Sequence, residues 1–261
     1  MKININAGHT LTGGDTGASG LKGLREEKLT RELAKEVQKV ANAKGIQSHI
    51  VAIDHANTLN DSLFLQKQGL NAHKVDYNII LHFNASANHF GNGSEIFTHQ
   101  GKQLPQAKRI LENLEKLGFN NRGIKQQELY LINATNDETL YIEVAFIDNL
   151  HDVHLIEQKG LNQIANAIVS GLLGTEMSPV ASKTYRNLIV YNGEVDKVAA
   201  TILSWGLENS FIISEQEYKK GLIKGTSIYS VGGANVGVDV VLRGSNRYDT
   251  IKMVLKRLKQ L

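Results

Sequence analysis

Residues 77–83 read YNIILHF, an almost uninterrupted apolar run that ends in His82 and Phe83. A short apolar run without polar alternation is typical of a central strand that is buried on both faces of a parallel sheet. Polar and small residues, Asn84 to Ser86, follow at once. Ligands and chemistry gather at the carboxyl ends of strands in open α/β sheets. The run therefore predicts both the fold and the edge of the sheet where a site would lie.

Strand-like and helix-like segments alternate on both sides of this run, through residue 173. This order predicts an α/β domain with a twisted, mostly parallel sheet flanked by helices. The predicted strands are 2–7, 47–52, 77–83, 94–99, 129–132 and 140–146, and the predicted helices are 26–44, 58–74, 104–118 and 153–173. In residues 26–44, leucines and valines recur at helical spacing, and Gly45 marks the end.

A second, smaller α/β domain is expected at residues 185–261. The segment GTEMSPVASKT, residues 174–184, is small and polar and contains one of the two prolines of the chain. Such a composition is typical of a linker. The sequence thus predicts domains at residues 1–174 and 185–261, with a linker at 175–184.

Composition excludes several classes of site. The chain has 261 residues and no cysteine, so neither a disulfide framework nor a cysteine zinc site is available. No apolar run reaches the ~20 residues that span a bilayer. The amino terminus opens on the strand-like KININA and lacks a standard secretion signal pattern. We therefore expect the protein to be made in the cytoplasm.

The net charge of +3 is unevenly distributed. Residues 1–179 carry 17 Lys and Arg against 19 Asp and Glu, whereas residues 180–261 carry 12 against 7. A basic C-terminal domain is compatible with a polyanionic partner such as nucleic acid or an anionic wall polymer. It is equally compatible with a solvated surface that keeps the domain soluble. Charge does not decide between these two hypotheses.

The histidines indicate a metal site. All nine lie between His9 and His154. His9 and His82 each stand at the end of a predicted strand, and Glu26 begins a predicted helix. Two histidines and a glutamate, with a fourth position open, form a common ligand set of catalytic zinc. Each residue also has an ordinary structural explanation, for Glu26 the favourable position of a carboxylate at a helix amino terminus.

Two further features border this candidate site. The glycine-rich loop at residues 7–20 lacks both the P-loop and the GxGxxG spacing, so it does not indicate nucleotide binding. It does allow close backbone approach to a ligand beside His9. Glu143 interrupts the apolar strand LYIEVAF. A buried carboxylate is costly, so Glu143 needs a partner or a catalytic role.

Taken together, these motifs resemble the zinc-dependent N-acetylmuramoyl-L-alanine amidases of the third amidase family. The resemblance covers residues 1–173 and rests on the strand ending in GH, the glycine-rich loop, Glu before a Leu-rich helix, LHFNAS followed by GSEIF, and IEVAFIDN. It implies that His9, Glu26 and His82 bind zinc and that Glu143 is the catalytic glutamate. Glu27 remains an alternative to Glu26. Asn84 and Ser86 are candidate substrate contacts, although a polar turn after a strand explains them as well.

The C-terminal domain is similar to the cell-wall-binding domains of clostridial-type phage endolysins, through VYNGEVDKVAATILSWG, SIYSVGG and VVLRGSNRYDT. This resemblance implies attachment to the wall without catalysis. Among the polar residues of RGSNRYDT, Asn246 is expected to cap a helix, and Arg–Asp pairing is expected to explain most of the others. We expect Trp205 and Tyr248 to be core residues and not sugar-binding platforms.

The leading functional hypothesis is a phage endolysin that hydrolyses the amide between N-acetylmuramic acid and L-alanine and so lyses a Gram-positive host. It would stay in the cytoplasm until a holin released it. The alternatives are a bacterial autolysin of the same chemistry and an inactive wall-binding protein. A nucleic-acid-binding protein is disfavoured by the charge of the larger domain and the single tryptophan. Expected partners are peptidoglycan and a wall polymer. A homodimer, or association with a shorter C-terminal product translated from Met177, is compatible with the sequence.

Overall fold

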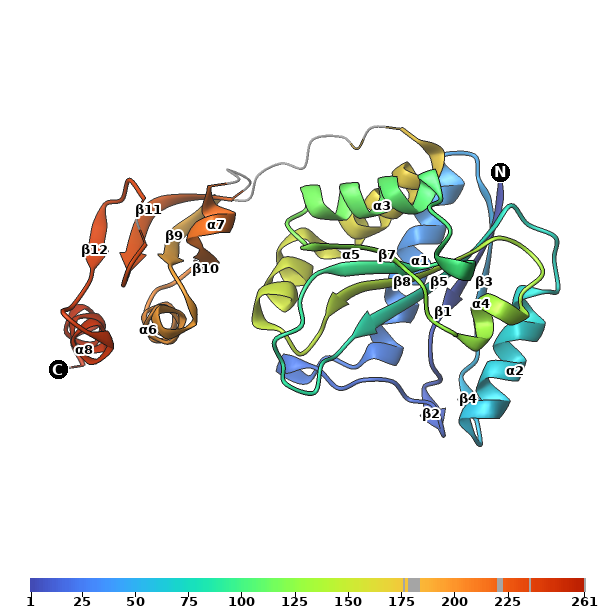
Figure 1. Cartoon of the computed structure of the whole chain (residues 1–261), viewed down its shortest axis with the longest axis horizontal. Helices are drawn as coiled ribbons and strands as arrows, with labels where there is room; N and C mark the ends of the chain where they lie inside the picture. Colours follow the sequence, from blue (N-terminus) through green and yellow to red (C-terminus); the bar gives the residue numbers. More distant parts are fainter. Residues whose placement is uncertain (176, 178–183, 220–222, 235, 261) are drawn as a thin grey trace. The chain divides into compact units, whose positions relative to one another are not determined.

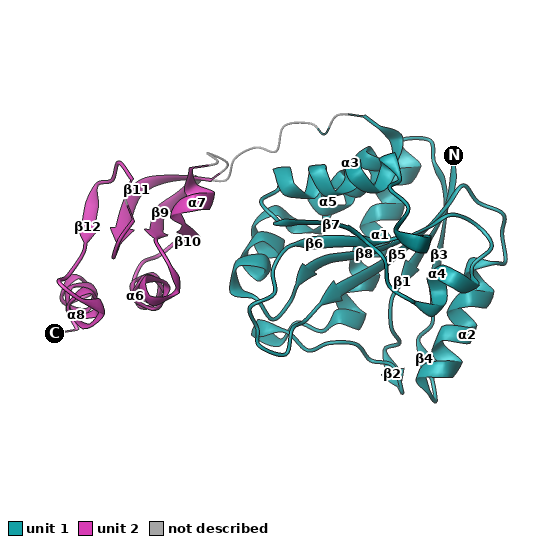
Figure 2. Ribbon diagram, in the orientation of Figure 1, with its two compact units in different colours: residues 1–180 teal, residues 181–261 magenta. Residues whose placement is uncertain are grey.

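The computed structural model describes residues 1–261 except 176, 178–183, 220–222, 235 and 261. It divides into two compact units, residues 1–180 and 181–261 (Figure 2). The division falls within the predicted linker, most of which lies outside the described residues. Met177 is described and packs against the core of the first unit. No helix among the described residues is long and apolar enough to span a bilayer.

A six-stranded sheet forms the first unit, in the order β3-β1-β5-β8-β6-β7 (Figure 1). Its strands are β1 (Lys2–Ala7), β3 (Gln47–Ala52), β5 (Tyr77–Asn84), β6 (Ser94–Phe97), β7 (Asn121–Lys125) and β8 (Thr139–Phe146). All neighbouring strands are parallel except β6 and β8, which are antiparallel. The predicted mostly parallel sheet is therefore confirmed. As expected from its sequence, β5 is central and almost entirely buried.

Helices cover both faces of this sheet. They are α1 (Glu26–Ala43), α2 (Leu59–Leu70), α3 (Pro105–Lys116), α4 (Tyr130–Ala134) and α5 (Leu150–Leu173). On one face α1, α3 and α5 pack on each other and on the strands to form the main core. On the opposite face α2 and α4 form a smaller core with Val51, Leu70, Ile80 and Leu131. Short pairings complete the unit: β2 (Thr12–Gly13) with β4 (His55–Ala56).

One prediction in this unit was wrong, one strand was missed, and one helix begins earlier than expected. Residues 129–132 were expected to be a strand, but Tyr130–Ala134 form α4, whose Leu131 and Ile132 are both buried. A short apolar run does not distinguish strand from helix by periodicity. The strand β7, NRGIK, was missed because it contains glycine and three polar residues and all five residues are half-buried. Helix α5 begins earlier than predicted, at Leu150, and is interrupted at Gly160, whose φ is 73°.

The second unit is a smaller α/β fold with a four-stranded parallel sheet in the order β10-β9-β11-β12. Its elements are β9 (Thr184–Tyr191), α6 (Glu194–Trp205), β10 (Ser210–Ser214), α7 (Glu215–Tyr218), β11 (Lys224–Val231), β12 (Val240–Leu242) and α8 (Arg247–Arg257). Helices α6 and α8 pack together on one face of the sheet, and a separate small core lies on the other.

Polar contacts at the start of α8 partly match the prediction. Asn246 caps the helix, since its Oδ1 accepts hydrogen bonds from the backbone N–H groups of Tyr248 and Asp249 at 2.9 and 3.0 Å. Asp249 is bound by Asn246 and Lys252 instead of an arginine, and Arg247 stacks on the Tyr248 ring. Trp205 and Tyr248 are not core residues: they are 78% and 62% exposed. They occupy the last residue of α6 and the first turn of α8, where the helix surface faces solvent.

Asp152 connects α5 to the end of β8 and to the residue that precedes β6. Its fully buried carboxylate accepts the backbone N–H of Gly93 at 2.7 Å and that of Phe146 at 2.8 Å. We predict that Asp152→Ala lowers the free energy of unfolding by about 3 kcal/mol or more, because two buried N–H groups lose a charged acceptor. Urea denaturation followed by far-UV circular dichroism measures this. The single tryptophan, Trp205, belongs to the other unit and would not report it.

Glu157→Ala on the same helix is the matched control. Glu157 pairs with Lys22, and both side chains are 48% exposed. An exposed ion pair contributes about 0.5 kcal/mol. Equal losses in the two variants would show that the Asp152 contacts do not stabilise this region.

Candidate active site

Two strands and a helix bring His9, Glu26 and His82 together. Strands β1 and β5 are parallel neighbours with Ala7 opposite Leu81, so His9 follows β1 beside His82. Glu26 is the first residue of α1. Its Oε2 lies 3.2 Å from His9 Nε2, and its Oε1 lies 2.9 Å from His82 Nδ1. One potential ligand atom from each residue lies within 4.8 Å of the others, the one such cluster found in the described part of the chain.

Glu26, and not Glu27, occupies the position between the two imidazoles. Its Oε2 also accepts the backbone N–H of Ala18 at 2.8 Å, and its Oε1 accepts that of Phe83 at 3.0 Å. Glu27 is equally buried, but its carboxylate pairs with Arg25 at 3.0 Å. The geometry therefore favours Glu26 as the third potential ligand.

Asp15 orients the His9 ring, a contact that the sequence analysis missed. Asp15 Oδ1 lies 2.5 Å from His9 Nδ1, and its Oδ2 accepts the hydroxyl of Ser62, on α2, at 2.6 Å. A carboxylate on the far nitrogen of an imidazole fixes the ring and its tautomer, as is common around metal-binding histidines. His9 itself has a φ of 67°, a left-handed conformation that is uncommon outside glycine. The only sequence signal for Asp15 was its place in the glycine-rich loop.

Glycines provide the space for this cluster. A Cβ at Gly17 would lie 2.7 Å from His9 Cδ2 and 2.9 Å from Glu26 Oε2. A Cβ at Gly8 would lie 2.3 Å from His82 Nε2. The backbone of the glycine-rich loop therefore lies closer to the cluster than it could if Gly8 or Gly17 carried a side chain.

The electrostatics of the cluster suit a cation. Burial disfavours a charged His9 ring, but hydrogen bonds with Asp15 and Glu26 outweigh it and raise the pKa of His9 to about 10. The pKa of Glu26 is lowered well below its usual range: burial opposes this, but its contacts with His82 and His9 prevail. Burial lowers the pKa of His82. Two carboxylates around two imidazoles thus demand positive charge, and the two-His, one-Glu donor set fits a divalent metal ion.

Glu143 lies beside this cluster on β8, directly opposite His82 in the register of β5 and β8. Its Oε2 is buried and has no hydrogen-bond partner in the described structure. Burial raises the pKa of Glu143 well above its usual range, and the negative charges of Glu26 and Glu95 raise it further. A carboxyl group that burial perturbs in this way, beside a potential metal site, is a candidate general acid or base.

Asn84 and Ser86 both make contacts within the protein. Asn84 Nδ2 donates to Glu95 Oε1 at 3.1 Å. The Ser86 backbone N–H donates to Asp148 at 2.9 Å, and its hydroxyl accepts from the N–H of Gly91. These contacts do not test a substrate-binding role.

The remaining histidines lie outside the cluster; His89, for example, pairs with Asp148 at 2.8 Å. Tyr141, which the sequence analysis also missed, stacks on the His82 ring with centroids 4.4 Å apart.

The first unit matches a family of known proteins. The Amidase_3 family, described as N-acetylmuramoyl-L-alanine amidase, matches residues 3–173. This chain belongs to that family. The matched region contains all of the residues of the cluster and Glu143.

Solved structures and curated proteins that are similar to this chain match comparable shares of it. The catalytic domain of the CD27L endolysin, which targets Clostridia difficile, is 31% identical with a TM-score of 0.63, over 68% of this chain and 99% of that domain. The N-acetylmuramoyl-L-alanine amidase LytC of Bacillus subtilis is 29% identical over 55% of this chain and 29% of its own length. The endolysin of Bacillus phage SPP1 is 23% identical over 64% of this chain and 63% of its own. The chain thus spans less than two thirds of either curated relative.

We predict that the chain binds one Zn²⁺ ion per molecule through this cluster. Glu26→Gln and His82→Ala should each lower zinc affinity by at least about tenfold, because each removes one of three ligands. Isothermal titration with zinc, started from protein treated with a chelator, measures this. His99→Ala, which changes a histidine outside the cluster, should bind like the wild type. Unchanged zinc binding in Glu26→Gln and His82→Ala would contradict the assignment.

Proposed function

We propose that the chain is a zinc-dependent amidase that hydrolyses the bond between the lactyl group of N-acetylmuramic acid and L-alanine in peptidoglycan. The observation that carries this proposal is the pairing of the His9–Glu26–His82 cluster with the unpartnered carboxyl of Glu143 on the neighbouring strand. Family membership supplies the substrate class. The endolysin and amidase relatives support it.

Each of these residues has a separate role in the proposed hydrolysis. His9, Glu26 and His82 would hold zinc, which when bound polarises the scissile carbonyl as a Lewis acid. Asp15 keeps the His9 ring oriented toward the metal position. Glu143 takes a proton from the attacking water and delivers it to the leaving amine of L-alanine.

Glu143→Gln tests whether Glu143 transfers the proton while the other residues bind zinc. It keeps the shape of the side chain but cannot accept the proton, so we expect the rate to fall at least about 100-fold while zinc binding is retained. The measurement is release of L-alanine amino termini from purified Gram-positive peptidoglycan, at equal zinc content. An amidase releases amino termini without new reducing sugars.

The outcomes separate the alternatives. Release by the wild type alone supports both the amidase and the role of Glu143. Equal release by both proteins would remove Glu143 from the mechanism. No release by either protein, with zinc bound to both, would favour the inactive wall-binding protein considered above.

We further propose that the protein acts as a phage endolysin and that its substrate is the wall of a Gram-positive host. The two endolysin relatives support this role, and the LytC relative of Bacillus subtilis supports the alternative of a bacterial enzyme with the same chemistry. In the endolysin role the enzyme would remain in the cytoplasm until a holin opened the membrane.

Association with a second copy, or with a shorter product translated from Met177, belongs to the same proposal. A single full-length band from native expression would exclude the shorter product.

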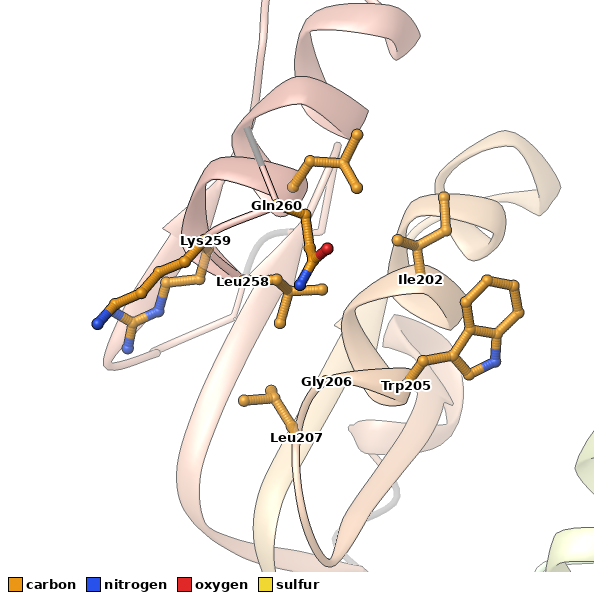
Figure 3. Close-up of a pocket in the computed structure, with 9 residues that line it drawn as sticks. Ile202, Trp205, Gly206, Leu207, Leu258, Lys259 and Gln260 are labelled. Atoms are coloured by element: carbon orange, nitrogen blue, oxygen red, sulfur yellow. The ribbon is translucent and has the colours of Figure 1, made fainter.

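The second unit is proposed to attach the enzyme to a wall polymer. Among residues 181–261 there are 12 Lys and Arg against 7 Asp and Glu. The carboxyl ends of α6 and α8 border a groove of about 770 Å³ (Figure 3). The indole of Trp205 lies on one side of this groove and the Lys259 side chain on the other, with Leu207 and Leu258 between them. An exposed aromatic ring beside cationic side chains suits an anionic sugar polymer.

We predict that Trp205→Ala lowers the fraction of the full-length protein that sediments with purified walls by about fivefold or more. An exposed ring contributes little to the core, so folding and the hydrolysis of soluble muramoyl peptides should be unchanged. Val241→Ala, at another exposed apolar residue of the unit, serves as the control. Full sedimentation of the Trp205 variant would locate the wall contact elsewhere.

A further inference from the structure

A row of ionisable side chains crosses one face of the sheet, starting at the metal cluster. His82 on β5 is opposite Glu143 on β8, and Glu143 is opposite Glu95 on β6. Side chains directly opposite one another in a sheet project from the same face. Beyond Glu95, the edge strand β7 supplies Arg122 and Lys125. The row thus extends from the imidazoles through two carboxylates to two cations.

A bulge in β7 directs both cations to the same carboxylate. In the register of β6 and β7, Ser94 is opposite Asn121 but Ile96 is opposite Ile124, so Glu95 faces two residues of β7. Residues three apart on a regular strand project from opposite faces, and one extra residue removes this difference. Gly123, within the bulge, has a φ of 83°. A Cβ there would meet nothing within 4 Å, so the position requires glycine for its backbone conformation and not for space.

Glu95 holds both cations at the surface. Arg122 Nε lies 2.8 Å from Glu95 Oε2, and Lys125 Nζ binds the same oxygen. The Glu95 side chain is 5% exposed, whereas those of Arg122 and Lys125 are 30% and 38% exposed. The Arg122 guanidinium also stacks on the Phe146 ring at 4.9 Å, and the Asn84 amide donates to the other oxygen of Glu95. Two cations on one carboxylate leave a net positive charge that is fixed in place and open to solvent.

This charge lies beside the proposed catalytic group. Helices α2 and α4 pack over the β3, β1 and β8 part of this face. Neighbouring strands are about 4.8 Å apart, so β7 lies about 10 Å from the strand that carries Glu143. An extended peptide advances about 3.5 Å per residue. A peptide that leaves the scissile nitrogen along this face would bring a carboxylate one residue beyond L-alanine within reach of the two long cationic side chains.

We propose that Arg122 and Lys125 bind the α-carboxylate of the residue that follows L-alanine, on the leaving side of the scissile bond. This inference rests on the amidase function proposed above. Glu95 and Gly123 are positioning residues, since they act by holding the two cations. An arginine and a lysine together give charge-assisted hydrogen bonds to a carboxylate, and a carboxamide at the same position would lose the charge.

The test compares two soluble substrates, N-acetylmuramoyl-L-alanyl-D-glutamate and N-acetylmuramoyl-L-alanyl-D-isoglutamine. They differ only in whether the α-carboxyl of the residue that follows L-alanine is free or amidated. We expect the full-chain zinc enzyme to have a higher kcat/KM for the free carboxylate. In Arg122→Gln/Lys125→Gln, kcat/KM for that substrate should fall about 10- to 100-fold, mainly through KM. For the amidated substrate it should change less than about threefold. Lys102→Gln, which removes a lysine paired with Glu138 outside the row, should leave both unchanged.

Gly123→Ala provides a second variant that keeps every charge. An alanine strains the bulge, so the preference for the free carboxylate should shrink while the melting temperature confirms a folded protein. Equal loss on the two substrates in the double variant, or no loss on either, would overturn the proposal.

Binding separates failure of this inference from failure of the amidase assignment. If the wild type hydrolyses neither peptide, release of L-alanine amino termini from peptidoglycan decides the amidase assignment, and titration of the same two peptides into the zinc-loaded protein still tests the subsite. Tighter binding of the free carboxylate that is lost in the double variant supports the subsite. Equal binding of both peptides refutes it.

Discussion

The site of the first unit depends on the contacts that the Glu26 carboxylate makes. The carboxylate lies between His9, which follows β1, and His82 on β5, and it also accepts backbone N–H groups from the glycine-rich loop and from β5. These contacts join the start of α1 to the ends of two neighbouring strands. Because Glu26 is buried, its charge is stable only if these partners stay in place. The chemistry of the site and the local packing of the fold therefore impose the same geometry.

Two neighbouring carboxylates on this sheet have opposite electrostatic environments. Glu143 and Glu95 are directly opposite in the register of β6 and β8. Burial and two nearby carboxylates raise the pKa of Glu143. Burial also acts to raise the pKa of Glu95, but Lys125 and Arg122 outweigh it and lower the value. One carboxylate is thus suited to proton transfer and the other to holding charge, and the cations on β7 make the difference.

The two units differ in what they offer a substrate. The first concentrates titratable groups on one edge and one face of its sheet. The second presents an exposed tryptophan at the end of α6 and basic side chains at the end of α8. Each unit has its own core. This separation is consistent with hydrolysis and attachment being carried by different parts of the chain.

The sequence by itself determined the α/β class, the central position of residues 77–83, the limits of α1 and α3 to within two residues, and the set of His9, Glu26, His82 and Glu143 as candidate residues. These features are encoded locally, by apolar runs, helical spacing and polar residues at strand ends. Only the tertiary structure distinguished Glu26 from Glu27, because both begin the same helix and only their partners differ. It alone showed Asp15, Tyr141 and the Glu95–Arg122–Lys125 group, whose contacts join residues from different elements. It also decided that residues 129–132 are not a strand and that Trp205 is exposed, since burial depends on which surfaces meet and not on residue type.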